Sequence, residues 1–133
     1  MDYSNTIITR ILNDEEYKLE LNIVIDILRQ NHIDKIDLLF GVAWGNEYKD
    51  WTPFTIGVDE IINEVDKAQK LNVGQLRNDD LYIILTDMEL EFLFCHESDI
   101  HISFNYANDI VTSIINKWDT KQLSHSTKTR NGG

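Results

Sequence analysis

Residues 81–104, LYIILTDMELEFLFCHESDIHISF, contain three short apolar segments separated by small groups of polar residues. The first segment, 81–85, is continuously apolar, which is typical of a central strand. The segments 90–95 and 100–104 follow after connections that are too short for a helix and allow only tight reversals. The stretch therefore predicts three neighbouring antiparallel strands. Consecutive strands of this kind favour an α+β fold over a doubly wound α/β fold.

Two helices are predicted before this stretch, at the start of the chain. Ser4 is suited to cap a short helix in which residues 7–12 place four apolar side chains on one face. Asn13 is followed three residues later by Glu16, which is the capping-box pattern at the start of a helix. Apolar residues then recur at helical spacing, so we expect this second, longer helix to continue to residues 30–32.

The remaining segments predict further strands and two more helices around the central stretch. Residues 36–44 are apolar and too short for a core helix, and they predict a buried strand, with a shorter one at 54–57. Asp59 is suited to cap a helix reaching about Leu71, and a last helix follows over residues 110–118. The predicted order is ααβ(β)αβββα. It forms an antiparallel or mixed sheet of about four to five strands, with the helices packed mainly on one face.

The composition predicts a single domain in residues 1–120. The chain has 133 residues, of which 42% are hydrophobic, and this is enough for one core. Apolar residues nearly disappear after Trp118, so we expect residues 121–133 to form a disordered tail. No apolar run of roughly 18 residues and no signal-peptide pattern occur, which predicts a cytoplasmic protein. The single cysteine, Cys95, permits no internal disulfide and no cysteine-rich zinc site.

Acidic charge is concentrated in the predicted domain. The chain has 23 acidic and 12 basic residues, a formal net charge of −11, and residues 121–133 contain three basic residues and no acid. Residues 1–120 therefore carry a formal net charge of −14. A surface of this kind repels phosphates, so we expect neither nucleic acid nor a membrane as a partner. It attracts a basic protein and speeds their encounter, although a role in solubility alone would also explain the charge.

Residues 95–101, CHESDIH, concentrate side chains that could bind a metal or a proton. A turn within this segment would bring its two histidines close together, so His96, Glu97, Asp99 and His101 are candidate ligands. Strand alternation instead places His96 on the core side, which predicts a buried neutral histidine with a structural role. Cys95 is expected to be a small buried core residue, since no cationic neighbour in the sequence would activate its thiolate.

The sequence contains no catalytic motif of a known type. It lacks GxSxG, HExxH, GxGxxG and P-loop patterns, so we expect a protein that is not an enzyme and needs no cofactor or metal. Residues 44–54 instead mix aromatic with acidic side chains, which is typical of a protein interface. We predict a partner-binding surface made by this loop and by the acidic turns next to the strands: Glu47, Tyr48, Asp50, Trp51, Asp79, Asp80, Glu97 and Asp99.

With its small acidic α+β domain and its segment FLFCHESDIHI at 92–102, the chain resembles the immunity proteins of contact-dependent growth inhibition and related polymorphic toxin systems. The resemblance implies a cytoplasmic protein that binds and neutralises a toxin domain, commonly a basic nuclease. Carboxylates would then occupy the groove for phosphates, and buried aromatic residues would slow dissociation. Two alternatives remain open: a small metal-binding protein or enzyme that uses residues 96–101, and an adaptor subunit of a cytoplasmic complex. The sequence leaves the oligomeric state open.

Overall fold

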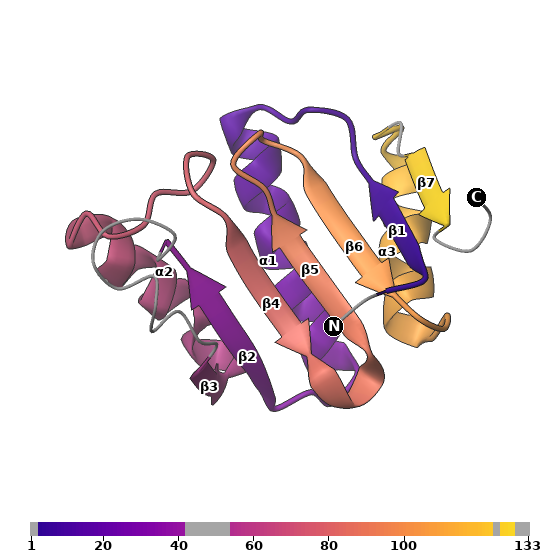
Figure 1. The fold of residues 1–133 in the computed structure, drawn as a ribbon, viewed down its shortest axis with the longest axis horizontal. Coiled ribbons are helices and arrows are strands. Elements are labelled where there is room, and N and C mark those ends of the chain that lie inside the picture. The colour runs from indigo at the N-terminus through magenta and orange to yellow at the C-terminus, as the bar shows by residue number, and fades with distance from the viewer. Residues whose placement is uncertain (1–2, 42–53, 124–125, 130–133) are drawn as a thin grey trace.

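The computed structural model describes residues 3–41, 54–123 and 126–129. These residues form one antiparallel sheet with three α-helices beside it (Figure 1). The helices are α1 (Asp14–Gln30), α2 (Ile61–Lys70) and α3 (Asp109–Thr120). In their order across the sheet, the strands are β3 (Phe54–Gly57), β2 (Lys35–Phe40), β4 (Leu81–Leu85), β5 (Leu90–Phe94), β6 (Ile100–Phe104), β1 (Asn5–Ile8) and β7 (Ser126–Thr129).

The three strands predicted from residues 81–104 lie together in the middle of the sheet. Strands β4, β5 and β6 are antiparallel neighbours, with Ile83 opposite Phe92 and Phe92 opposite Ile102. All three of these side chains are fully buried, as expected for central strands. The predicted α+β class is therefore confirmed. The sheet is larger than expected, since it has seven strands rather than four to five.

Side chains alternate strictly between the two faces of the central strands. In β4, β5 and β6 the first, third and fifth residues of the strand are buried, and the second and fourth are only partly buried. Figure 1 shows all three helices behind the sheet, on one side of it. The helices therefore cover the face that carries the core, and no other described helix or strand covers the opposite face of the sheet.

Helix α1 begins where the capping-box pattern predicted. The Asn13 side-chain oxygen accepts a hydrogen bond from the Glu16 backbone N–H at 2.9 Å, and Glu16 Oε1 accepts one from the Asn13 backbone N–H at 3.0 Å. Both contacts satisfy N–H groups that a helix start would otherwise leave unpaired. Its buried positions face the sheet and its exposed positions face outward. No helix among the described residues is both long and apolar enough to cross a membrane.

The first predicted helix is absent from the described structure, and strand β1 takes its place. Residues 5–8 pair with β6 on one side and with β7 on the other, and only Ile7 of this strand is buried in the core. Ile11 was expected on the same apolar face, yet 70% of its surface is exposed. Four apolar residues at helical spacing are too few to nucleate a stable helix, whereas the open edge of β6 offers a row of backbone partners.

The structure also differs from the prediction of a disordered tail at 121–133. Lys121 forms an ion pair with the buried Glu20, Leu123 is buried, and Ser126–Thr129 form strand β7 at the edge of the sheet. An edge strand is held by backbone hydrogen bonds to one neighbour, here β1, and therefore needs no run of apolar side chains. The sequence STKT is polar throughout, so its side-chain pattern does not predict strand β7.

Strand β2 ends earlier than the apolar segment 36–44 suggested. It stops at Phe40, and Gly41 follows with a φ of 67°, a left-handed conformation that favours glycine. A Cβ atom at Gly41 would lie only 2.3 Å from the Val73 carbonyl oxygen, so the close approach of these two segments also requires glycine. Residues 42–44 lie outside the described residues.

Candidate functional site

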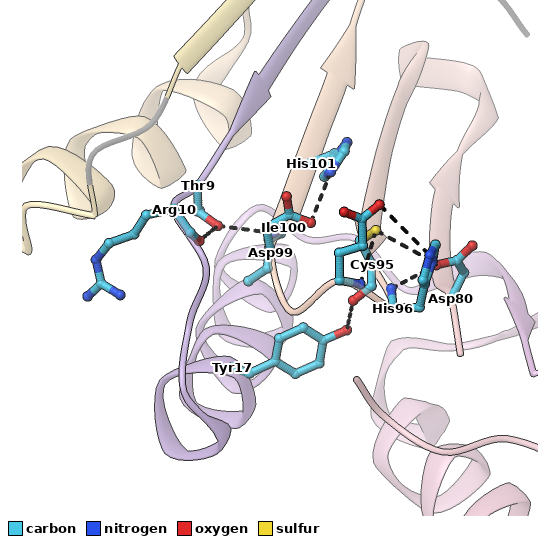
Figure 2. A network of polar contacts seen from close by, with 10 residues as sticks. Thr9, Arg10, Tyr17, Asp80, Cys95, His96, Asp99, Ile100 and His101 are labelled. Atoms are coloured by element: carbon cyan, nitrogen blue, oxygen red, sulfur yellow. Dashed lines mark hydrogen bonds and ion pairs between the residues drawn. The ribbon is translucent and has the colours of Figure 1, made fainter. Parts of the chain in front are cut away.

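Six polar residues from the start of β4, the turn between β5 and β6, and β6 itself meet at one end of the sheet, and we call this group the acidic end. Leu81 pairs with Phe94, and Phe94 pairs with Ile100, so the start of β4 lies beside the turn between β5 and β6. Figure 2 shows the resulting network of contacts. The acidic end consists of Asp80, Cys95, His96, Glu97, Asp99 and His101.

The turn at the centre of this site is held firmly by backbone contacts. Cys95 N–H donates to the Asp99 carbonyl at 2.9 Å, and Ser98 N–H donates to the Cys95 carbonyl at 3.0 Å. Ser98 adopts a φ of 70°, which lets the chain reverse within three residues. The segments on either side add support, because Leu12 N–H donates to the Ser98 carbonyl and the Tyr17 hydroxyl donates to the Cys95 carbonyl. The side chains of this turn are therefore presented on a rigid support.

His96 is a surface residue, contrary to the prediction of a buried neutral histidine. Its side chain is 54% exposed, and its Nδ1 atom lies 2.8 Å from Asp80 Oδ1. The Asp80 carboxylate also accepts the His96 backbone N–H at 2.8 Å. The alternation of β5 ends at Phe94, so the turn rotates His96 away from the core face. The hydrogen bond that His96 donates to the Asp80 carboxylate raises the pKa of His96, and the charges of Asp80, Glu97 and Asp99 add to the increase.

Cys95 is buried, as expected from the sequence. Burial raises the pKa of its thiol to about 11, so the free thiol stays protonated at neutral pH. Its sulfur lies 3.8 Å from His96 Nδ1, which is the same nitrogen that contacts Asp80. In a Cys–His–Asp triad the two partners of the histidine occupy different ring nitrogens. This arrangement therefore does not activate Cys95 as a nucleophile.

His101 and His96 lie in separate pairs, although the sequence suggested that they could share one site. His101 Nε2 lies 3.1 Å from Asp99 Oδ1, and both side chains are mostly buried. His101 points from β6 toward the open face of the sheet, opposite Leu93 on β5. The two pairs lie on either side of Cys95, whose sulfur is within 4.8 Å of ligand atoms in each pair.

Negative potential extends over the whole acidic end. Burial raises the pKa of Tyr17, and the carboxylates of Asp80 and Asp99 raise it further. The same two carboxylates contribute to the raised pKa of Cys95 and of His96. Four different groups, one of them Tyr82 near Asp80, therefore respond to the same excess of negative charge. Such a site attracts cations or cationic side chains.

Half of the predicted partner-binding residues lie at this site or beside it. Asp80 and Glu97 contact His96, and Asp99 pairs with His101. The Asp79 carboxylate instead accepts the Gln75 backbone N–H at 2.8 Å. Four further predicted residues lie outside the described residues: Glu47, Tyr48, Asp50 and Trp51.

Sequence reasoning missed the pairing of Asp80 with His96, which is the closest side-chain contact of the site. The two residues are 16 positions apart, and only the register of β4 with β5 brings them together. It also missed the support from Tyr17, which lies in α1, and from Arg77, whose Nε donates to Ser98 Oγ at 3.0 Å. The short connection between two predicted antiparallel strands was a usable signal, because it places Asp80, just before β4, opposite Cys95, which is the neighbour of His96.

Two hollows of the described surface lie away from the acidic end. One of about 270 Å³ is lined by Asp37 and Asp87 among others, and a smaller one of about 200 Å³ lies between β2 and α2 beside Phe54 and Leu71. Neither contains a residue of the acidic end. At the acidic end the side chains of His96 and Glu97 are 54% and 72% exposed, so a macromolecule or an ion can reach them.

Comparisons of this chain with known protein families, curated proteins and solved structures gave no match. The function of the chain therefore has to be argued from its own residues.

Proposed function

We propose that this protein is a cytoplasmic immunity protein, without enzymatic activity, that neutralises the basic toxin domain of a polymorphic toxin system. The observation that carries the proposal is the acidic end, where Asp80 and Glu97 contact the exposed His96 and Asp99 adds its charge from the same turn. Carboxylates placed in this way can occupy a basic groove that would otherwise bind phosphates.

The charge of the whole chain supports the same function. A formal net charge of −11 creates a long-range field that attracts a basic partner and raises the rate of encounter. The acidic end then provides a local match, because the negative potential of its carboxylates acts on several neighbouring groups. A long-range field alone would attract a basic partner, but it would not fix the orientation in which the partner docks.

The rigidity of the acidic end supports binding as well. Glu97 and Asp99 lie on a turn whose backbone is fixed by contacts to α1 and to the segment before it, and Asp80 accepts the backbone N–H of His96 from the same turn. A preformed surface loses little conformational entropy when a partner docks, and this favours tight binding. The exposed side chains of His96 and Glu97 are accessible to a macromolecular partner.

The test is binding to the toxin domain encoded beside the gene, measured by surface plasmon resonance at several salt concentrations. Glu97 has a 72% exposed side chain, so Glu97→Lys changes the charge with little effect on folding. We expect this variant to associate about three to ten times more slowly at low salt, with a weaker dependence on salt. Co-expression should show the same change as reduced protection against the toxin.

Asp66→Lys is the matched control. Asp66 is exposed on α2, away from the acidic end, and its reversal changes the net charge by the same amount. If Asp66→Lys slowed association as much as Glu97→Lys, the local surface would have no special role. If the wild-type protein neither bound nor neutralised the toxin domain encoded beside it, the proposed function would be wrong.

A further inference from the structure

Three side chains with different metal-binding chemistry converge at the acidic end. The carboxylate of Asp80, the sulfur of Cys95 and the imidazole of His96 offer ligand atoms that all lie within 4.8 Å of one another. The sulfur lies 3.8 Å from His96 Nδ1, and that nitrogen lies 2.8 Å from Asp80 Oδ1 (Figure 2). Ligand atoms around a tetrahedral zinc ion are about 3.3 to 3.7 Å apart, a value that follows from the usual bond lengths. The sulfur–nitrogen and nitrogen–oxygen separations therefore each differ from a tetrahedral site by about half an ångström or less, and the sulfur and the Asp80 oxygen lie within 4.8 Å of each other.

We propose that Asp80, Cys95 and His96 form a binding site for a zinc-class divalent cation. The cation would take the Cys95 thiolate, His96 Nδ1 and one Asp80 carboxylate oxygen, and a water molecule would occupy the fourth position. This inference does not depend on the immunity function, because it concerns the ion and not the protein partner.

The donor set determines which metal fits. A thiolate and an imidazole favour borderline-soft ions such as Zn²⁺ or Co²⁺, whereas Mg²⁺ and Ca²⁺ require oxygen ligands. The negative potential of the neighbouring carboxylates favours any cation, but the sulfur and nitrogen donors discriminate between them. Binding releases the thiol proton of Cys95 to the solvent. A neutral His96 moves its proton from Nδ1 to Nε2, and a protonated His96 releases the Nδ1 proton to the solvent, so both groups become ligands without a further reagent.

Surrounding contacts already orient these donors. The Glu97 backbone N–H lies 3.5 Å from the Cys95 sulfur, where it would stabilise a thiolate. The Glu97 carboxylate lies 3.8 Å from His96 Nε2, the ring nitrogen that the metal would leave free. A carboxylate next to the second nitrogen of a metal-bound histidine is a common arrangement at zinc sites. The His96 backbone N–H holds Asp80 in place at 2.8 Å.

A second group with the same types of donor shares Cys95 and provides an internal comparison. Asp99 and His101 also lie within 4.8 Å of Cys95 and of each other. Their side chains are less exposed than that of His96, and the His101 ring faces Asp99 through Nε2. An ion could reach the exposed His96 more readily, so we assign the site to the first group.

The experiment is a titration of the reduced full-length protein with Co²⁺, followed by displacement with Zn²⁺. We expect one equivalent of Co²⁺ to produce a thiolate-to-cobalt charge-transfer band, which Zn²⁺ then removes. His96→Gln alters an exposed side chain and should weaken Co²⁺ binding at least about tenfold, a loss typical of the removal of one ligand. Cys95→Ser should abolish the charge-transfer band, with circular dichroism as the check that the protein remains folded.

His101→Gln and His32→Gln are the matched controls, and both should retain the band and the affinity. Absence of a charge-transfer band in the folded wild-type protein would overturn the metal site. Loss of binding in His101→Gln together with normal binding in His96→Gln would overturn the assignment to Asp80, Cys95 and His96. Binding that survived His96→Gln unchanged would overturn it as well.

Discussion

Glu20 is a buried carboxylate whose contacts connect two helices and the segment that follows them. It is only 2% exposed, and its two oxygens have different partners: Trp118 Nε1 donates to one at 3.0 Å and Lys121 Nζ to the other at 2.7 Å. Both partners are distant in sequence. A buried charge with two partners holds the surrounding elements in one arrangement, because the loss of any one contact leaves a polar group unsatisfied.

Removal of this carboxylate should destabilise the protein strongly. We expect Glu20→Ala to lower the free energy of unfolding by about 3 kcal/mol, since it removes one half of a buried pair and leaves Trp118 without its acceptor. Glu20→Gln keeps an acceptor for Trp118 and should cost less. Urea denaturation measures both effects. Glu15→Ala, at an exposed position of the same helix, is the control, and an equal loss in that variant would contradict a special role for Glu20.

At the scale of elements, the start of α1 should depend on pH. Arg10 and the Asn13 backbone lower the pKa of Glu16 to about 2, from an ordinary value of 4.5. A carboxyl with a depressed pKa in the folded state stabilises the protein above pH 4.5, and this contribution disappears as the pH falls toward 2. Wild type should therefore be more stable than Glu16→Gln at pH 7, and the difference should shrink between pH 4.5 and pH 2.

Thermal denaturation of both proteins across this pH range is the measurement. Asp26→Asn is the control for a general loss of charge. Asp26 lies later in the same helix, where it pairs with Arg29 and not with a residue of the helix start. A stability difference between wild type and Glu16→Gln that stayed constant down to pH 2 would show that the carboxylate form has no such role.

Strand β7 should protect β1 from solvent exchange. Deletion of residues 124–133 removes the strand but retains Lys121 and Leu123. We expect a loss of about 1 to 2 kcal/mol in the free energy of unfolding, which is the usual size for local changes. The amides of residues 5–8 that face β7 should exchange faster with deuterium, while those of β5 should not change. Unaltered exchange in β1 would mean that this segment does not form a strand in solution.

At the scale of the whole molecule, the net charge of −11 should oppose folding through self-repulsion. The Debye length falls from about 30 Å at 0.01 M salt to about 8 Å at 0.15 M, so added salt screens this repulsion. We expect the melting temperature to rise by about 2 to 4 °C over that range, a shift that corresponds to less than about 1 kcal/mol. Differential scanning calorimetry in NaCl provides the measurement.

The surface ion pairs would produce the opposite response. Arg29 with Asp59 and Arg10 with Glu16 are exposed pairs that salt weakens. A melting temperature that fell with added NaCl would show that such pairs outweigh the net repulsion. Asp66→Lys lowers the net negative charge by two and should reduce the response to salt, which distinguishes repulsion from effects of salt on the solvent.

Local patterns in the sequence determined the central part of this protein. The three strands at 81–104 and the start of α1 could be predicted because alternation, tight connections and a capping box act between residues close in the chain. The acidity of residues 1–120 and the burial of Cys95 were also readable from composition and position.

Only the tertiary structure decided the edges of the sheet and the pairing within the acidic end. Residues 5–8 and 126–129 are strands because the backbone of a neighbouring strand was available to them, and backbone hydrogen bonds leave no pattern in side chains. Asp80 and His96 meet because β4 and β5 pair in one register. A contact between residues distant in the chain depends on how the whole sheet is assembled, and no local pattern records that assembly.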